Sequence, residues 1–143
     1  MKKILFSAFA AIALSGAANA SGDDTLAGAW SFQAEVQEDC EFAGSAEIRR
    51  TTVPNYFLCE MTVRDVCQGN EAIVRQSCVV TREGDKVKVN AVIKEYFLKP
   101  DAKYQPDNFR LTIEKETGDM VGELDSYGIW KAKWTRTDGR GTS

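Results

Sequence analysis

The chain has 143 residues, of which 43% are hydrophobic and 27% charged, with four cysteines, no histidine and a formal net charge of −3. This composition is that of one ordinary globular domain and excludes a disordered chain or a bundle of membrane helices. A mildly acidic chain without a basic cluster is a poor candidate for binding nucleic acid. The absence of histidine excludes Ser-His-Asp catalysis and imidazole zinc sites.

The N-terminus has the three parts of a secretory signal peptide. Lys2 and Lys3 supply positive charge, and residues 4–14 form an apolar run too short to span a bilayer. Ala18 and Ala20 are small residues of the kind that signal peptidase requires. We predict cleavage after Ala20 and a mature protein that is periplasmic or secreted. A permanent membrane anchor is the alternative.

From Trp30 onward, apolar and polar residues alternate with a period of two, which predicts β-strands with one dry face and one wet face. The clearest run is 86–94, where valine, alanine and isoleucine alternate with lysine and asparagine. The predicted strands lie at residues 30–37, 46–49, 57–64, 72–81, 86–94, 109–114, 120–124 and 130–134. No stretch after residue 20 shows a helical stripe with caps.

Short turn signals separate most of these strands: Pro54-Asn55, Gly69-Asn70, Gly84-Asp85 and Gly118-Asp119. Longer connections are expected at 37–44 and 95–107. Eight sequential strands with short turns predict an all-β fold, an eight-stranded antiparallel up-and-down β-barrel, because closure removes the two exposed edges of an open sheet. A two-sheet sandwich is the alternative.

The domain organisation follows from these elements. We predict a signal peptide at 1–20, a flexible leader at 21–28, a single barrel domain at 29–137 and a disordered tail at 138–143. A barrel in an outer membrane turns an apolar band toward lipid. That arrangement would place Glu35, Lys88 and Lys133 in the bilayer, so we expect a water-soluble barrel without membrane insertion.

Cys40, Cys59, Cys67 and Cys78 are even in number and destined for an oxidising compartment, which predicts two disulfides. A four-thiolate zinc site is the alternative, but it usually has close C-x2-4-C pairs, and the spacings here are 18, 7 and 10 residues. We predict no metal. Opposing residues of an antiparallel hairpin have numbers with a constant sum. The turns near residues 53 and 68 therefore pair Cys40 with Cys67 and Cys59 with Cys78.

The first strand contains Gly28-Ala29-Trp30, a G-x-W sequence, and the last strand carries Arg136 in phase with its tryptophans. These features resemble the calycin superfamily, which includes the lipocalins and a group of bacterial protease inhibitors. The resemblance implies a lipocalin-like barrel in which Trp30 closes one end and Arg136 packs across its ring. Independently of any family, Arg136 has inward parity, and a guanidinium stacked on indole gains about 0.5–2 kcal/mol. No helix pattern follows the last strand, where lipocalins have one.

Residues suited to chemistry are scarce, and we predict neither an enzyme nor a cofactor. Asp65 and Gln76 have inward parity, so they either line a pocket, cap a barrel end or hydrogen-bond to each other. Asp101 and Asp107 lie in the longest predicted connection and are interpreted as solvated loop acids.

The same connection gathers the aromatic residues Tyr96, Phe97 and Tyr104 beside Leu98. Loops on a rigid scaffold often carry binding residues, so this segment is expected to gate the barrel mouth or to present an epitope. The alternative is that it folds back as a lid that completes the core. Tyr96, Phe97, Tyr104 and Gln76 are therefore the candidate ligand or lid residues.

Two functions follow from this reading. The favoured one is a secreted, non-catalytic binding barrel that takes a small apolar ligand at its open end. The alternative, implied by the calycin resemblance, is a protein inhibitor of a secreted hydrolase whose leader, residues 21–25, enters the enzyme's cleft. The volume of the barrel interior decides between these two functions, because a drug-sized ligand needs a cavity of about 300 Å³. The bulky inward residues that compete for this space are Trp30, Phe32, Phe57, Met61, Phe109, Met120, Trp130 and Trp134.

Overall fold

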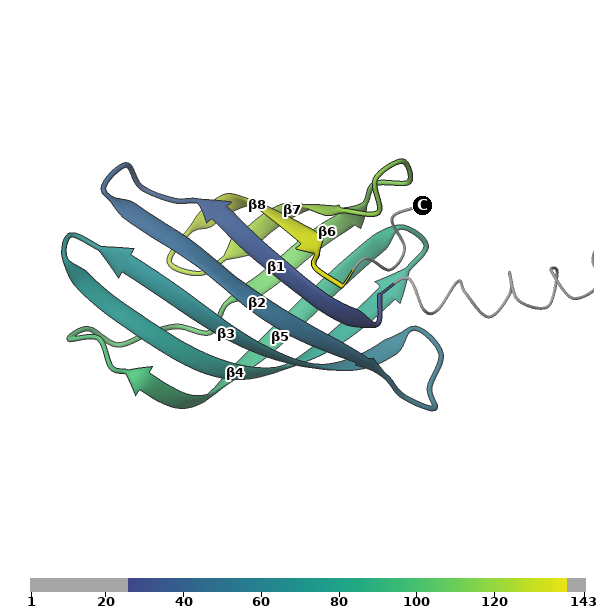
Figure 1. The fold of residues 1–143 in the computed structure, drawn as a ribbon, viewed down its shortest axis with the longest axis horizontal. Coiled ribbons are helices and arrows are strands. Elements are labelled where there is room, and N and C mark those ends of the chain that lie inside the picture. The colour runs from purple at the N-terminus through teal and green to yellow at the C-terminus, as the bar shows by residue number, and fades with distance from the viewer. Residues whose placement is uncertain (1–25, 139–143) are drawn as a thin grey trace, which may run out of the picture.

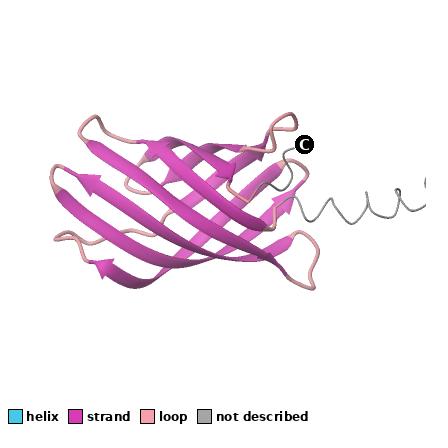
Figure 2. Ribbon diagram, viewed as in Figure 1, coloured by secondary structure: helices cyan, strands magenta, loops and turns pink. Residues whose placement is uncertain are grey.

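The computed structural model describes residues 26–138, which form eight strands and no helix (Figures 1 and 2). The predicted signal peptide, the leader up to residue 25 and the tail from residue 139 lie outside the described residues. In that part of the chain there is accordingly no helix that could span a membrane. The strands are β1 (Gly28–Glu35), β2 (Cys40–Arg50), β3 (Tyr56–Cys67), β4 (Asn70–Glu83), β5 (Lys86–Leu98), β6 (Asn108–Ile113), β7 (Met120–Asp125) and β8 (Ile129–Arg136).

The strands form a closed antiparallel barrel in which each strand pairs with the next and β8 pairs with β1. The closing seam runs from the pair Trp30–Arg136 to the pair Glu35–Lys131. The predicted fold class is confirmed, and the sandwich alternative is wrong. Closure satisfies the backbone hydrogen-bonding groups that β1 and β8 would otherwise expose as sheet edges.

The barrel has two different ends (Figure 1). The closed end holds the first and last described residues and the turns at 51–55, 84–85 and 114–119. The opposite end, called the open end from here on, holds the connections at 36–39, 68–69, 99–107 and 126–128.

The apolar faces point inward, as the alternation predicts. In β5, Val87, Val89 and Ala91 are buried, whereas Lys86 and Lys88 are exposed. The centre of the core is aromatic, with Phe32 stacked on Trp134 at 4.7 Å between ring centroids. Gly44 lies on β2 and pairs with Phe32 of β1. A Cβ at this position would lie 2.5 Å from the Phe32 ring, so only glycine fits without repacking.

Arg136 and Trp30 seal the closed end. The guanidinium carbon of Arg136 lies 4.6 Å from the Trp30 ring centroid, and Nη1 donates a hydrogen bond of 2.8 Å to the carbonyl of Ala27. This is the contact expected from their parity, and it satisfies a charge that is otherwise costly to bury. Gly28 has a φ of +127°, and a Cβ there would overlap the Asp138 carboxylate.

Packing at this end begins earlier than residue 29, where the sequence places the start of the barrel. Leu26 is 1% exposed, and its carbonyl accepts a hydrogen bond of 2.9 Å from Trp30 Nε1. At the other end of the chain, Asp138 Oδ2 accepts a hydrogen bond from the Ala29 amide. Residues 26–28 and Asp138 are therefore part of the packed domain.

Both predicted disulfides are present. Cys40 pairs with Cys67 across β2 and β3, and Cys59 pairs with Cys78 across β3 and β4, with Cα–Cα distances of 4.1 and 4.6 Å. Since all four cysteines are used, the four-thiolate zinc alternative is wrong. Two disulfides are typical of proteins in an oxidising, extracellular or periplasmic environment.

The structure corrects two predicted connections. β2 starts at Cys40, so the expected connection at 37–44 shortens to 36–39. β5 continues to Leu98, which reduces the expected loop 95–107 to 99–107 and places Tyr96 and Phe97 on a strand. The β4–β5 register shifts twice, and Lys94 and Phe97 are left out of the pairing, as in β-bulges. Bulges break the strict alternation from which the end of the strand was predicted.

Candidate ligand-binding site

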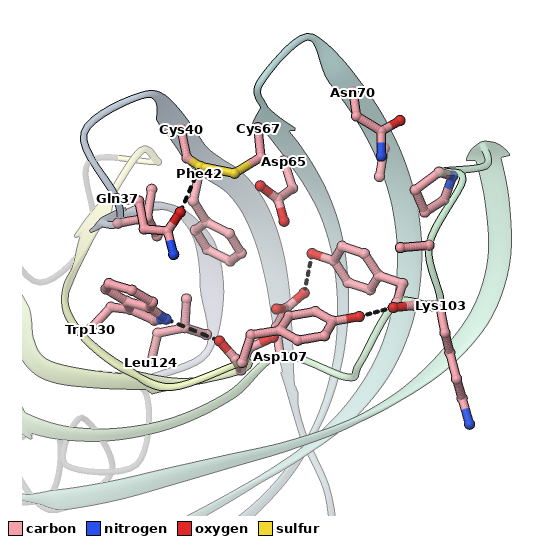
Figure 3. Close-up of a pocket in the computed structure, with 17 residues that line it drawn as sticks. Gln37, Cys40, Phe42, Asp65, Cys67, Asn70, Lys103, Asp107, Leu124 and Trp130 are labelled. Carbon is pink, nitrogen blue, oxygen red and sulfur yellow. Dashed lines mark hydrogen bonds between the residues drawn. A yellow bond between two sulfur atoms is a disulfide. The ribbon is translucent and has the colours of Figure 1, made fainter.

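A cavity of about 280 Å³ lies at the open end of the barrel (Figure 3). At this end of the barrel the pairing of β5 and β6 stops at Val89–Phe109, and the 99–107 loop that connects the two strands contributes part of the cavity wall. Where the ladder stops, the Asn108 side chain replaces it and accepts a hydrogen bond of 2.8 Å from the Ala91 amide. The walls come from β2, β3, β4, β7, β8 and the loop.

A buried polar cluster lies beside the cavity, made of Gln76, Tyr104 and Asp107. Gln76 Nε2 donates to Asp107 Oδ2 at 2.6 Å, and Gln76 Oε1 accepts from the Asp107 amide at 3.0 Å. The Tyr104 hydroxyl donates to the same carboxylate oxygen at 2.8 Å. These bonds fasten the 99–107 loop to β4, inside the barrel.

Asp107 is the acid of this cluster. Its side chain is fully buried, and this burial raises the pKa of the carboxyl from 3.8 to about 6. The contacts with Gln76, Tyr104 and Ser126 act in the opposite direction, and the charge of Asp65 raises the pKa further. Within residues 26–138, Oδ1 accepts no hydrogen bond. Burial and the negative charge of Asp107 also raise the pKa of Tyr104 far above its ordinary value, so the phenol stays protonated.

A second carboxylate, that of Asp65 on β3, lines the same cavity. Its side chain is half-buried, and this desolvation raises the pKa. Figure 3 shows the carboxylate below the Cys40–Cys67 disulfide, directed toward the space between Phe42 and the loop. Lys103 also belongs to the wall, but its side chain extends away from the cavity in the same view.

The rest of the wall includes three aromatic side chains, those of Phe42, Tyr127 and Trp130. Phe42 is buried, and Trp130 is half-buried with its indole N–H bonded to the Ser126 carbonyl at 3.0 Å. The Tyr127 hydroxyl donates to the Lys103 carbonyl, which ties the β7–β8 turn to the loop. The Tyr127 ring meets the Tyr104 ring edge-on at 6.3 Å between centroids. The site is therefore a small aromatic pocket that contains two acids.

The structure brings together two of the four candidate ligand or lid residues. Gln76 and Tyr104 form the polar cluster, and Tyr104 completes a small apolar cluster with Ala72 and Val74. Tyr96 packs against the edge of that cluster, outside the cavity lining. Phe97 is 56% exposed because it lies at a bulge, so it faces away from the barrel interior. The loop thus contains a lid segment that completes the core, as one of the two alternatives predicts.

The interpretation of Asp107 as a solvated loop acid is wrong. Gln76 makes its hydrogen bonds to Asp107 and not to Asp65, the partner considered from the sequence. A usable signal was present: Asp107 precedes β6 with the same parity as Phe109 and Leu111, which both face inward. Asp101 is exposed, as expected.

Phe42, Trp130 and Tyr127 were not singled out as site residues. The alternation predicts Trp130 in the filled interior, whereas it borders the cavity. The other bulky inward residues fill the barrel between its middle and the closed end. In the part of the barrel formed by residues 26–138, these side chains pack into one core, and the cavity lies beside the 99–107 loop.

The fold and the cavity together define a small, closed, eight-stranded barrel with a shallow site at one end. No protein-family model matches the sequence, and comparison with curated proteins finds no significant relative. Among solved structures, the chain is similar to a designed protein described as a "De novo design of a fluorescence-activating beta barrel". The match has a TM-score of 0.53 and 12% identity, and it covers 82% of this chain and 98% of the designed one. At that identity the similarity concerns the fold alone.

Proposed function

We propose that this protein is a non-catalytic binding barrel that takes one small, largely apolar molecule into the cavity at its open end. The observation that carries the proposal is the cavity of about 280 Å³, with Phe42 and Trp130 in its wall. Small-molecule sites are typically concave and apolar, with a few polar groups that fix orientation. An empty cavity of roughly 150 Å³ already accommodates benzene, so this one has room for a ring with a short substituent.

The fold adds support of a general kind. An eight-stranded barrel has an interior just wide enough for side chains or for one small ligand. The designed barrel of similar fold is described as fluorescence-activating. The Arg136–Trp30 contact also favours a distant relation to the calycins, whose members share such a closed end.

Export belongs to the same proposal. The disulfides favour an oxidising compartment, and cleavage after Ala20 would give a mature chain that begins at Ser21. N-terminal sequencing of the exported protein checks this cleavage site.

The inhibitor alternative depends on residues 21–25. Deletion of these residues is expected to abolish inhibition of a co-secreted protease if that alternative holds.

The binding proposal is tested by closing the cavity. Ala102 is exposed and lines the cavity, so Ala102→Trp is expected to fill the cavity without disturbing the core. Phenethyl alcohol, a neutral aromatic probe, is titrated while tryptophan fluorescence is followed. The wild type is expected to bind and Ala102→Trp to lose binding. Glu116→Trp, on a turn at the closed end, is the matched control and is expected to bind like the wild type. Equal binding of the alcohol by Ala102→Trp and the wild type would show that this cavity is not the binding site.

A further inference from the structure

The cavity contains more negative charge than its own side chains neutralise. Asp65 makes no hydrogen bond and no ion pair with any of residues 26–138, although it is half-buried. Asp107 is fully buried, and its Oδ1 lacks a partner among the same residues. Buried carboxylate oxygens are normally hydrogen-bonded or paired with a positive charge, and Asp107 Oδ1 lacks such a partner among the described residues. Asp65 adds a second, half-buried carboxylate to the lining of the same cavity.

Among residues 26–138, no side chain directs a positive charge into the cavity. Lys103 is the cationic residue of the lining, and its side chain extends away from the cavity (Figure 3). The hydrogen bonds from Gln76 and Tyr104 both go to Oδ2 of Asp107, which leaves Oδ1 for another donor. A ligand that enters this space meets two carboxylates and no opposing charge from the described lining.

The aromatic wall selects the kind of cation. Phe42, Trp130 and Tyr104 line the same cavity, and the faces of aromatic rings attract organic cations. A hard divalent ion takes six or more oxygen ligands, which an aromatic wall does not provide. The combination of ring faces with carboxylates is suited to a protonated amine on an apolar body.

We infer that the ligand of this barrel is a small organic cation, a protonated amine with one ring or a short apolar chain, whose ammonium group pairs with Asp65 at the cavity wall and whose body lies against Phe42 and Trp130. This inference rests on the proposed function and specifies its ligand class. Asp107, which is fully buried in the same wall, adds a second carboxylate.

The test compares three probes of the same size and different charge: phenethylamine, which is protonated at neutral pH, phenethyl alcohol and phenylacetate. Each is titrated into the full mature protein by isothermal calorimetry. We expect phenethylamine to bind about tenfold tighter than the alcohol, because a charge-assisted hydrogen bond is roughly twice as strong as a neutral one. Phenylacetate is expected to bind most weakly.

Two variants assign the charge preference to the cavity. Asp65→Asn keeps the side-chain shape and is expected to reduce phenethylamine affinity to within about twofold of the alcohol, without changing alcohol binding. Asp101→Asn removes the same charge from an exposed position of the neighbouring loop and is expected to bind like the wild type. Thermal unfolding of each variant verifies that the barrel is intact.

The outcomes separate the inference from the proposed function. If alcohol and amine bind equally well, the cavity is a binding site but the inference is overturned. If the amine preference persists in Asp65→Asn, the pairing with Asp65 is wrong. If none of the three probes binds, both the inference and the proposed function are contradicted.

Discussion

At the scale of single residues, the hydrogen bonds between Gln76 and Asp107 hold the 99–107 loop against β4 at the open end. Folding buries a carboxyl group and gives one of its oxygens two donors, while the other oxygen has no partner among the described residues. Burial outweighs the hydrogen bonds, so the pKa of Asp107 rises to about 6. The folded protein therefore binds a proton at this site more readily than the unfolded chain.

This shift predicts a specific pH dependence of stability. Because the pKa of Asp107 is raised on folding, its contribution to stability is greatest below the unfolded value near 4 and is lost as the pH rises through about 6. The rise in the pKa of Asp107 from 3.8 to about 6 corresponds to about 3 kcal/mol of stability. The free energy of unfolding of Asp107→Asn, minus that of the wild type, is expected to increase between these pH values and to level off above them.

Denaturant unfolding at a series of pH values measures this difference. Asp101→Asn is the matched control, because the carboxyl of Asp101 is exposed on the same loop, and its difference from the wild type is expected to stay flat. A flat profile for Asp107→Asn as well would mean that Asp107 is not desolvated in solution.

At the scale of strands, the two disulfides fasten the same three-stranded segment in different surroundings. Cys59 and Cys78 are 2% and 4% exposed, inside the core between β3 and β4. Cys40 and Cys67 are partly exposed at the rim of the cavity. Thiol–disulfide exchange requires access to a sulfur atom, so the two bonds are expected to differ in their reaction with a reductant.

We expect limited reduction of the native protein to open Cys40–Cys67 first. Alkylation after brief exposure to a phosphine, followed by peptide mapping, is expected to label Cys40 and Cys67 while Cys59 and Cys78 remain bonded. Simultaneous labelling of all four cysteines would show that reduction proceeds through global unfolding.

Mapping without reductant is expected to recover the 40–67 and 59–78 peptides, and any other pairing contradicts the β2–β3–β4 register.

Strands were the most predictable feature of the sequence. Alternation fixed the inward face of each strand, and the constant sum of opposing residue numbers predicted both disulfides, since turns near residues 53 and 68 set the registers. The ends of β5 were less predictable. Bulges at Lys94 and Phe97 interrupt the alternation, because the strand bends where β6 leaves it.

The site was less predictable than the fold for a physical reason. Parity identified Gln76 as buried, but its partner lies 31 positions away in a loop, and loop conformation depends on tertiary contacts that no local pattern records. Tyr104 was selected as aromatic surface, and its burial beside Ala72 follows only from the closure of the loop over β4. Part of the cavity wall comes from the same loop, so its shape depends on these tertiary contacts as well.

At the scale of the whole molecule, the first and last described residues lie together at the closed end, at the opposite end of the barrel from the cavity (Figure 1). The Thr137 amide donates to the Ala29 carbonyl at 3.0 Å, and the Ala29 amide donates to Asp138. Chain ends that lie this close tolerate circular permutation when the new ends are placed in an exposed turn.

A permutant that joins Asp138 to Leu26 through a short Gly/Ser linker and starts at Asp85 is therefore expected to fold. Gly84 and Asp85 form an exposed turn at the closed end, so the cavity and both disulfides are preserved. Circular dichroism and phenethyl alcohol binding are expected to match those of the wild type, with a lower melting temperature. A second permutant opened between Val79 and Val80, in the middle of β4, is expected not to fold. Folding of both would indicate that the β3–β4–β5 ladder is dispensable.

The pairing of the first strand with the last also determines the order in which the strands can pair during synthesis. In the nascent chain β1 is the first strand to emerge and its partner β8 is the last, so two sheet edges remain unpaired until residue 136 has appeared. Both cystines lie within residues 40–78, which emerge in the first half of this interval. Oxidation can thus join β2, β3 and β4 before β8 is available, and the pairing of β1 with β8 is then the last step of barrel closure.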